Sequence, residues 1–214
     1  MNPDDQKISG FLAATWLLAP FGALTVFVVS GWTRSLDDAW NTAMSAGEAA
    51  WLVNVAMVFH HGGTFPIALA TVVIVTIGFL ALRQWWIAGA WVAMVAVSQL
   101  LSKFTKALVG RERPLDGLVQ ESSAAYPSGH TMVSGVAIAV GLAVLLGILW
   151  PNRHRLFLSI GIWYAVLMAL SRTYLRAHWL TDVVGGLLFG AVVVLVVAAM
   201  AARRSSLSRP SSLP

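Results

Sequence analysis

Long apolar runs separated by short polar segments dominate the pattern along this chain. A helix needs about 20 residues to cross the hydrocarbon core of a membrane, where every backbone polar group must be satisfied internally. Six runs have that length, at residues 8–31, 64–82, 85–102, 131–150, 156–174 and 183–202. The pattern predicts an all-α integral membrane bundle of six transmembrane helices, formed as a single domain over residues 1–202.

The first run and the segment after it need separate treatment. The run at 8–31 follows two acidic residues and is longer than the apolar part of a signal peptide, so we expect a mature helix. Residues 32–63 are too polar to cross, but Ser35 and Asp38 have the spacing of a capping box, and apolar residues follow at helical spacing. We expect one additional interfacial helix between the first and second spans. It forms either a lip beside a lipid entrance or a connector packed on the bundle.

The composition agrees with a membrane protein. Hydrophobic residues make up 58% of the 214 residues and charged residues only 11%, whereas a soluble domain is about half apolar and a quarter charged. The net charge of +5 comes from few charges, so we expect membrane lipids and not nucleic acid as partners. The absence of cysteine excludes disulfides, thiolate metal sites and cysteine nucleophiles. The Ser- and Pro-rich residues 203–214 are expected to form a disordered cytoplasmic tail.

Two loops hold a concentration of ionisable residues, and the two helices between them place both loops on one face of the membrane. The first loop contains the pattern K-x6-R-P and ends in P-S-G-H, and the second contains S-R-x5-H-x3-D. Burying an ionisable residue in a membrane costs about 2.5 to 3.5 kcal/mol on insertion scales. In a bundle this poor in charge, these residues are therefore candidates for function.

The cations of the two loops suit a phosphoryl group. Lys106, Arg113 and Arg172 supply positive charge, and a guanidinium can bind two oxygens at once. Ser128 is a good helix N-cap, and Gly129 lets the backbone approach an anion at the positive end of the helix that follows. We expect these five residues to bind phosphate.

The histidines of the loops suit nucleophilic and acid catalysis. His178 and Asp182 are four residues apart, so on a helical turn Asp182 can accept a hydrogen bond from one ring nitrogen. The other nitrogen then carries the lone pair of an oriented nucleophile. His130, on a separate helix, can protonate a leaving oxygen. No carboxylate cluster suited to Mg²⁺ is evident near the motifs, so we expect no metal and no cofactor.

Together these motifs resemble the three signature motifs of the type 2 phosphatidic acid phosphatase superfamily, the lipid phosphate phosphatases. The match includes eleven residues, at Lys106, Arg113, Pro114, Pro127, Ser128, Gly129, His130, Ser171, Arg172, His178 and Asp182. The resemblance implies a metal-independent reaction in which His178 forms a phosphohistidine, His130 acts as the general acid and Asp182 orients His178. Among the matched residues, Pro114, Pro127 and Ser171 support the site. The layout is similar to that of the compact bacterial phosphatidylglycerophosphate and undecaprenyl pyrophosphate phosphatases.

The resemblance favours a membrane enzyme that hydrolyses a lipid phosphate or pyrophosphate. Undecaprenyl pyrophosphate is the first expected substrate, followed by phosphatidylglycerophosphate and other polyprenyl-linked phosphates. A lipid phosphotransferase is a related alternative, and a non-catalytic carrier of anionic lipids is an alternative from a different class.

Arg111 and Arg176 flank the motifs and either hold a second phosphate or meet lipid headgroups. Glu121 lies in a loop similar to that of the bacterial enzymes, whereas His60 and His61 are expected to be turn histidines at the interface.

The basic residues predict an orientation once the site is set aside. With a cytoplasmic N-terminus, seven basic residues lie on each side of the membrane. Removing Lys106, Arg113 and Arg172 leaves seven inside and four outside, which favours cytoplasmic termini and a periplasmic or extracellular site in the cell (inner) membrane.

Gly186 and Gly190 form a small-x-x-x-small pair that serves internal packing first and dimerisation second, so the oligomeric state stays open.

Overall fold

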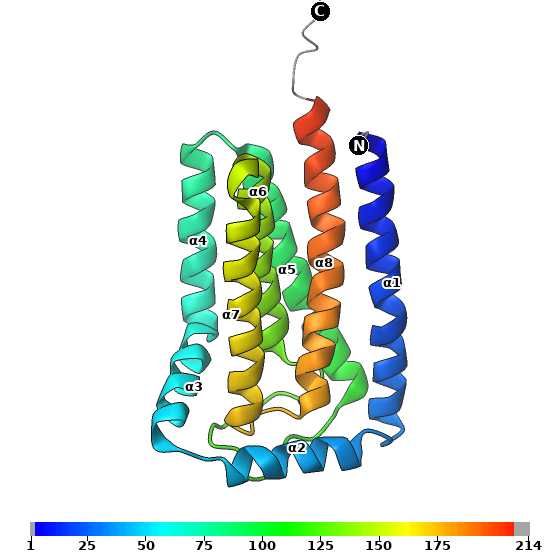
Figure 1. The fold of residues 1–214 in the computed structure, drawn as a ribbon, viewed down its shortest axis with the longest axis vertical. Helices are drawn as coiled ribbons and strands as arrows, with labels where there is room; N and C mark the ends of the chain where they lie inside the picture. The colour runs from blue at the N-terminus through cyan, green and yellow to red at the C-terminus, as the bar shows by residue number, and fades with distance from the viewer. Residues whose placement is uncertain (1–2, 208–214) are drawn as a thin grey trace, which may run out of the picture.

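The computed structural model describes residues 3–207, and all the regular structure in this range is helical. The elements are α1 (Pro3–Val29), α2 (Arg34–Ala46), α3 (Ala50–Gly62), α4 (Phe65–Ala81), α5 (Trp85–Val109), the π-helix η1 (His130–Val140), α6 (Gly141–Leu149), the short 3₁₀ helix η2 (Pro151–Arg153), α7 (His154–Tyr174) and α8 (Leu180–Leu207). The long helices run side by side along one axis, and α2 lies across one end of the bundle (Figure 1). The all-α prediction is confirmed.

Five helical segments are long and apolar enough to cross a membrane. They are Leu12–Val29, Trp85–Val109, His130–Leu149, Pro151–Tyr174 and Leu180–Ala201. Helices α3 and α4 pass the same test together, but the pair is bent by 57° at the break between them. Counting this pair as one span gives the six that the sequence predicts. The second span is therefore a bent pair of helices, where a single helix over 64–82 was expected.

The segment between the first and second spans holds two helices instead of the expected one. Helix α2 crosses the end of the bundle, as an interfacial helix would (Figure 1). Its N-cap is Thr33, which makes no side-chain capping bond, so the capping box expected from Ser35 and Asp38 does not begin this helix. Helix α3 has an apolar sequence and continues into α4, so it belongs with the second span.

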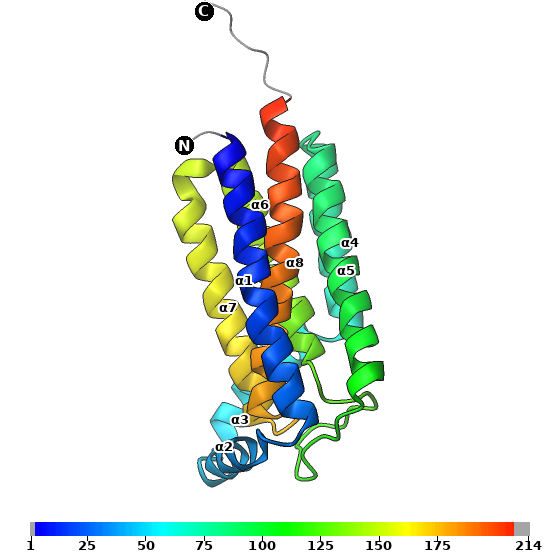
Figure 2. The ribbon, with the colours of Figure 1, turned by 90° about the vertical axis from the view of Figure 1, so that its right-hand side faces the viewer.

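The two ends of the bundle differ in what they carry. The first turn of α1 and the last turn of α8 lie at one end, whereas α2 and the connections after α5 and α7 lie at the other (Figures 1 and 2). Helix α8 continues to Leu207, five residues into the predicted disordered tail, because residues 203–207 contain no Gly or Pro to end it. The rest of that tail, residues 208–214, lies outside the described residues.

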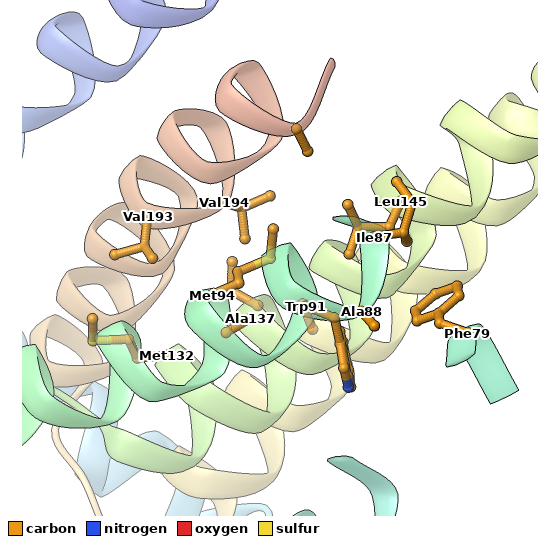
Figure 3. Packing of buried hydrophobic residues seen from close by; sticks show 13 residues of the cluster. Phe79, Ile87, Ala88, Trp91, Met94, Met132, Ala137, Leu145, Val193 and Val194 are labelled. Carbon is orange, nitrogen blue, oxygen red and sulfur yellow. The ribbon is translucent and has the colours of Figure 1, made fainter. Parts of the chain in front are cut away.

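A buried apolar cluster holds the helices of the site together. Trp91 and Met94 of α5 and Met132 of η1 are fully buried, and they pack with residues of α6 and α8 (Figure 3). Helix α8 approaches η1 closely at two glycines. A Cβ atom on Gly190 would lie 2.8 Å from Val136 Cβ, and one on Gly186 would lie 2.8 Å from the Ser128 carbonyl oxygen. These glycines therefore serve packing inside the bundle.

Candidate active site

The two loops predicted to carry chemistry meet at the end of the bundle beside α2. One follows α5 and the other follows α7, and they are joined by a hydrogen bond from Leu118 N to Leu175 O, 2.9 Å long. A second bond of 2.9 Å runs from Ser128 N to Asp182 O. The loops border a cavity of about 460 Å³, whose polar lining includes Lys106, Arg113, Glu121, His130 and His178. The fold thus brings residues far apart in the sequence to one cavity.

His178 and Asp182 form the pair expected from their spacing. Asp182 lies in the first turn of α8, and its Oδ2 is 3.3 Å from His178 Nδ1 and accepts a 2.9 Å hydrogen bond from Trp179 N. Both side chains are almost completely buried. Because Nδ1 donates to the carboxylate, Nε2 carries the lone pair, and it accepts a hydrogen bond from Arg113 Nη1 at 3.1 Å. The lone pair of His178 is therefore directed toward the phosphate-binding cations.

The surroundings of His178 keep its ring neutral. Burial is the main cause that lowers the pKa of His178 well below 6.5, and the positive charges of Arg113, Arg172 and Lys106 lower it further. A neutral imidazole has a free electron pair, whereas an imidazolium does not. The site therefore holds this histidine in the form that can act as a nucleophile.

The three predicted phosphate-binding cations converge on this end of the bundle, and two of them line the cavity. Lys106 donates to the carbonyl oxygen of Ala124, and Arg113 donates to those of Ser123 and Ala177, at 2.7 and 2.6 Å. Burial is the main cause that lowers the pKa of Arg113. Carbonyl oxygens thus hold two cations in place without neutralising them.

The third cation, Arg172, is fully buried behind the cavity wall. Its Nη2 donates to Glu121 Oε1 at 2.6 Å, and its Nη1 donates to His60 Nδ1 at 2.7 Å. Glu121 lines the cavity and stands between Arg172 and that space. His60 was expected to be a turn histidine, but it lies in the last turn of α3, which the bend between α3 and α4 brings to the site.

His130 begins η1, directly after the first loop, and lines the cavity. Its ring stacks on that of His60, with centroids 5.5 Å apart and planes 17° apart. Its Nε2 is buried and has no hydrogen-bond partner among the described residues. A Cβ atom on Gly63 would collide with this ring, so the glycine makes room for it. His130 therefore has a ring nitrogen available to bond an oxygen atom of a ligand.

The remaining motif residues shape the loops. Ser128 is buried, and its Oγ accepts a 3.0 Å bond from Thr131 Oγ1 and a 3.4 Å bond from Thr131 N. The N-cap of η1 is Gly129, one residue later than the N-cap expected at Ser128. Gly129 lines the cavity beside Lys106. Pro114, Pro127 and Ser171 are buried and do not line it.

The two arginines that flank the motifs are occupied by acids. Arg111 lies 2.6 Å from oxygens of both Asp37 and Asp182. Arg176 lies 2.8 Å from Glu48 Oε2 and 2.9 Å from Asp116 Oδ2. Neither arginine lines the cavity. The structure thus gives both arginines acidic partners within the protein.

One group of side chains has the spacing of a metal site. His60, Glu121 and His130 offer ligand atoms that all lie within 4.8 Å of one another. Arg172 already donates to Glu121 and His60, so a cationic guanidinium occupies the position where a metal would bind. Two nitrogens and one carboxylate also differ from the all-oxygen ligands that Mg²⁺ prefers. The sequence did not predict this group because His60 lies outside the motifs.

The cavity continues from the charged end into the apolar part of the bundle. Phe65, Leu69 and Val72 of α4 line one side of this part, and Val92 and Val95 of α5 line the other. Its surface beside the cations is polar, and its surface between the two helices is apolar. The cavity thus fits a molecule with an anionic head and a hydrocarbon chain.

Comparisons with known proteins agree with this geometry. The profile of the PAP2 superfamily matches residues 87–206. Over 168 residues the chain is 32% identical to phosphatidylglycerophosphatase B of Bacillus subtilis, covering 77% of this chain and 82% of the relative. It is 27% identical over 170 residues to the lipid A 1-phosphatase of Rhizobium etli, covering 73% and 68%.

A solved structure gives the same result for the fold. The chain superposes on the crystal structure of the first transmembrane PAP2 type phosphatidylglycerolphosphate phosphatase from Bacillus subtilis with a TM-score of 0.83 at 27% identity. The match covers 92% of this chain and 98% of that chain. The resemblance inferred from the motifs is confirmed: the chain belongs to the PAP2 superfamily and is a multi-pass membrane enzyme that hydrolyses lipid phosphates.

Proposed function

We propose that this enzyme hydrolyses phosphatidylglycerophosphate to phosphatidylglycerol and inorganic phosphate. The observation that carries the proposal is the single cavity that joins His130, His178 and the cations to an apolar space between α4 and α5. A lipid phosphate placed there has its phosphoryl group beside the histidines and its hydrocarbon among apolar side chains. The name of the Bacillus subtilis relative supports this headgroup.

In the proposed reaction, His178 Nε2 attacks phosphorus. A phosphorus–nitrogen bond forms while the bond from phosphorus to the lipid oxygen breaks, and His130 gives that oxygen a proton from Nε2. Asp182 keeps Nδ1 protonated and stabilises the positive charge on the His178 ring. Water then attacks the phosphohistidine, His130 accepts a proton from the water, and inorganic phosphate leaves.

The cations supply the electrostatic part of catalysis. Lys106 and Arg113 bind the equatorial oxygens of the phosphoryl group, and the backbone at Gly129, which lines the cavity, faces the same group. Ser128 does not line the cavity, and its N–H group is bonded to Asp182 O. In the free enzyme a carboxylate oxygen of Glu121 is bonded to Arg172. We infer that a phosphoryl oxygen takes its place when substrate binds. No step in this scheme uses a metal ion.

A second apolar groove favours a lipid with two chains. This groove, a cavity of about 450 Å³, lies between α4, η1, α6 and α7, and it shares Ala68 and Ser134 with the first cavity. A diacyl lipid can therefore place one chain on each side of α4. A polyprenyl lipid has a single chain and fills only one of the two spaces.

Undecaprenyl pyrophosphate, the substrate first expected from the sequence, receives no specific support and becomes the second candidate. Its extra phosphate needs additional positive charge at the cavity. Arg111 and Arg176, which were considered for that role, are both held in ion pairs away from the cavity. Neither arginine therefore supplies charge to a second phosphate, and Lys103 is the remaining basic residue that lines the cavity beside Lys106 and Arg113.

The substrate is tested by measuring phosphate release from purified enzyme with a panel of lipids. The panel contains diacyl phosphatidylglycerophosphate, its single-chain lyso form and undecaprenyl pyrophosphate. We expect the highest kcat/KM for the diacyl lipid and at least a tenfold lower value for the lyso form. Preference for undecaprenyl pyrophosphate would overturn the substrate assignment, and binding without phosphate release would indicate a carrier.

We also propose that the termini are cytoplasmic and that the site faces the outer side of the membrane, as the distribution of basic residues favours. The start of α1 and the end of α8 lie at the end of the bundle opposite α2 (Figure 1). The charged residues that line the cavity lie at the end with α2, which agrees with this orientation. Reporters fused after residue 214 and within the loop after α5 test it. Activity of a cytoplasmic reporter at the loop, or of a periplasmic reporter at the C-terminus, would contradict the proposal.

A further inference from the structure

Helix α2 is largely exposed, but one of its acidic residues is completely enclosed. Asp37 is only 1% exposed, whereas its neighbour Asp38 is exposed. Asp37 accepts three hydrogen bonds, from Arg111 Nη2 at 2.6 Å and from the backbone N and Oγ1 of Thr181 at 2.9 and 2.8 Å. A buried carboxylate needs such partners, because an unpaired buried charge is very costly. Asp37 thus joins the interfacial helix to the first turn of α8.

Arg111 connects Asp37 to the carboxylate next to His178. Its Nη2 donates to Asp37, and its Nη1 donates to Asp182 Oδ1 at 2.6 Å. The guanidinium also lies 5.6 Å from the centre of the Trp179 ring. The guanidinium bonds the two carboxylates through two separate nitrogens held in one plane, whereas lysine presents a single charged nitrogen on a flexible stem.

These contacts fix both oxygens of Asp182. Arg111 holds Oδ1, while Trp179 N and His178 Nδ1 hold Oδ2. A carboxylate bonded on both oxygens cannot rotate, so it presents Oδ2 to the imidazole in one direction. The order of contacts is therefore Asp37, Arg111, Asp182 and His178, from the membrane interface to the cavity.

Asp37 and Arg111 do not line the cavity. A substrate there meets His178 but neither of these two residues. Removing an interaction that acts only through the orientation of a reacting group lowers kcat and leaves substrate binding nearly unchanged. This signature separates a positioning role from a role in lipid binding.

We propose that Asp37 and Arg111 are positioning residues that hold Asp182, and through it His178, in the geometry for attack on phosphorus. The inference rests on the proposed function, because it takes His178 as the reacting group. It also gives α2 a specific role, since the buried acid of this helix anchors the nucleophile.

The first test replaces Asp37 by Asn, with Asp38→Asn as the matched control on the same helix. We expect D37N to lower kcat about 10- to 100-fold, the range typical when a residue supporting a site residue is lost. The KM for phosphatidylglycerophosphate is expected to stay within about twofold of the native value. The inhibition constant of vanadate, used as a phosphate-like anion that reports on binding alone, is expected to stay in the same range. D38N retains full activity. Unchanged kcat in folded D37N, or a raised KM with unchanged kcat, would overturn the proposal.

The second test replaces Arg111 by Lys, which keeps the charge and removes the fork. We expect R111K to lower kcat as D37N does. The kcat of the double variant D37N/R111K is expected to be little lower than that of either single variant, because both residues act through one chain of contacts. Thermal unfolding in detergent shows whether each variant is folded. If D37N does not fold, R111K decides the question, and unchanged kcat in that variant overturns the proposal.

The two proposals fail in different ways. If the native enzyme releases no phosphate from phosphatidylglycerophosphate, the proposed function is wrong. If His178→Ala keeps activity, the proposed mechanism is wrong, whatever D37N does. If His178→Ala is inactive while D37N and R111K keep full kcat, the function stands and the positioning role is wrong.

Discussion

The residue to which we assign the attack on phosphorus is a histidine whose two ring nitrogens have different partners. In His178, Nδ1 faces Asp182 and Nε2 faces Arg113. A carboxylate on one side fixes the tautomer, and the cation on the other side is one that we propose to bind the phosphoryl group. The same side chain thus combines orientation with a lone pair that points at the anion site.

Asp182→Asn is expected to remove most of this orientation. The amide retains the volume but can present its NH₂ group to Nδ1, which favours the wrong tautomer. In a catalytic triad the equivalent change lowers kcat by about 10⁴-fold. We expect a loss of this order in phosphate release, with KM changed little. Turnover equal to that of the native enzyme would contradict the assigned role of Asp182.

The dependence of kcat/KM on pH reports on the same residue. Burial and the nearby charges of Arg113, Arg172, Lys106 and His130 all lower the pKa of His178 below 6.5. Activity is present while the ring is neutral and is lost as pH falls through this lowered pKa. We therefore expect the acidic limb of the profile to lie below pH 6.5. A limb above that value would show that His178 is charged at neutral pH.

The sequence identified the motif residues because each motif has fixed internal spacing. Lys106, Arg113, His130 and His178 all reach one cavity, as the parity of the spans predicted. Asp37 was not predicted, because its partner Arg111 is 74 residues away and no motif links them. Only the folded chain shows that contact.

At the scale of elements, helices α8 and η1 begin beside the two histidines to which we assign catalysis, and they pack directly on each other. Helix α8 carries Asp182 in its first turn, and η1 begins with His130. The helices approach closely at Gly186 and Gly190. A change at this contact is expected to affect stability and turnover together.

Gly190→Ala tests this contact with the smallest possible addition. The new Cβ would lie 2.8 Å from Val136 Cβ and 3.0 Å from the Met132 carbonyl oxygen, so the helices must separate. Overpacking of this kind costs about 1 to 3 kcal/mol. We expect a lower unfolding temperature and a lower kcat. Gly89→Ala in α5 is the matched control, because nothing lies within 4 Å of its Cβ. Equal behaviour of the two variants would contradict the packing argument.

The apolar periodicity predicted the long spans better than the elements near the interface. The sequence predicted one interfacial helix in residues 32–63 and no separate helix α3, although Ala50–Gly62 itself is apolar. Its bend toward α4 places His60 beside Arg172. That consequence depends on the angle between two helices, which no local pattern specifies.

At the scale of the whole molecule, the protein places a charged site at the end of an apolar bundle. Within residues 3–207, the group with metal-like spacing is His60, Glu121 and His130, and Arg172 is bonded to two of its members. We therefore expect EDTA to leave phosphate release unchanged. Loss of activity that Mg²⁺ restores would show that the reaction needs a metal ion.

The proposed mechanism depends on one bond, between His178 and phosphorus. The most direct test is phosphate release from phosphatidylglycerophosphate by the purified native enzyme and by His178→Ala, with thermal unfolding measured on both. We predict that the variant unfolds at a similar temperature and loses activity by roughly 10⁴-fold or more, as expected when a nucleophile is removed. A folded His178→Ala enzyme that keeps a tenth or more of the native rate would contradict the mechanism.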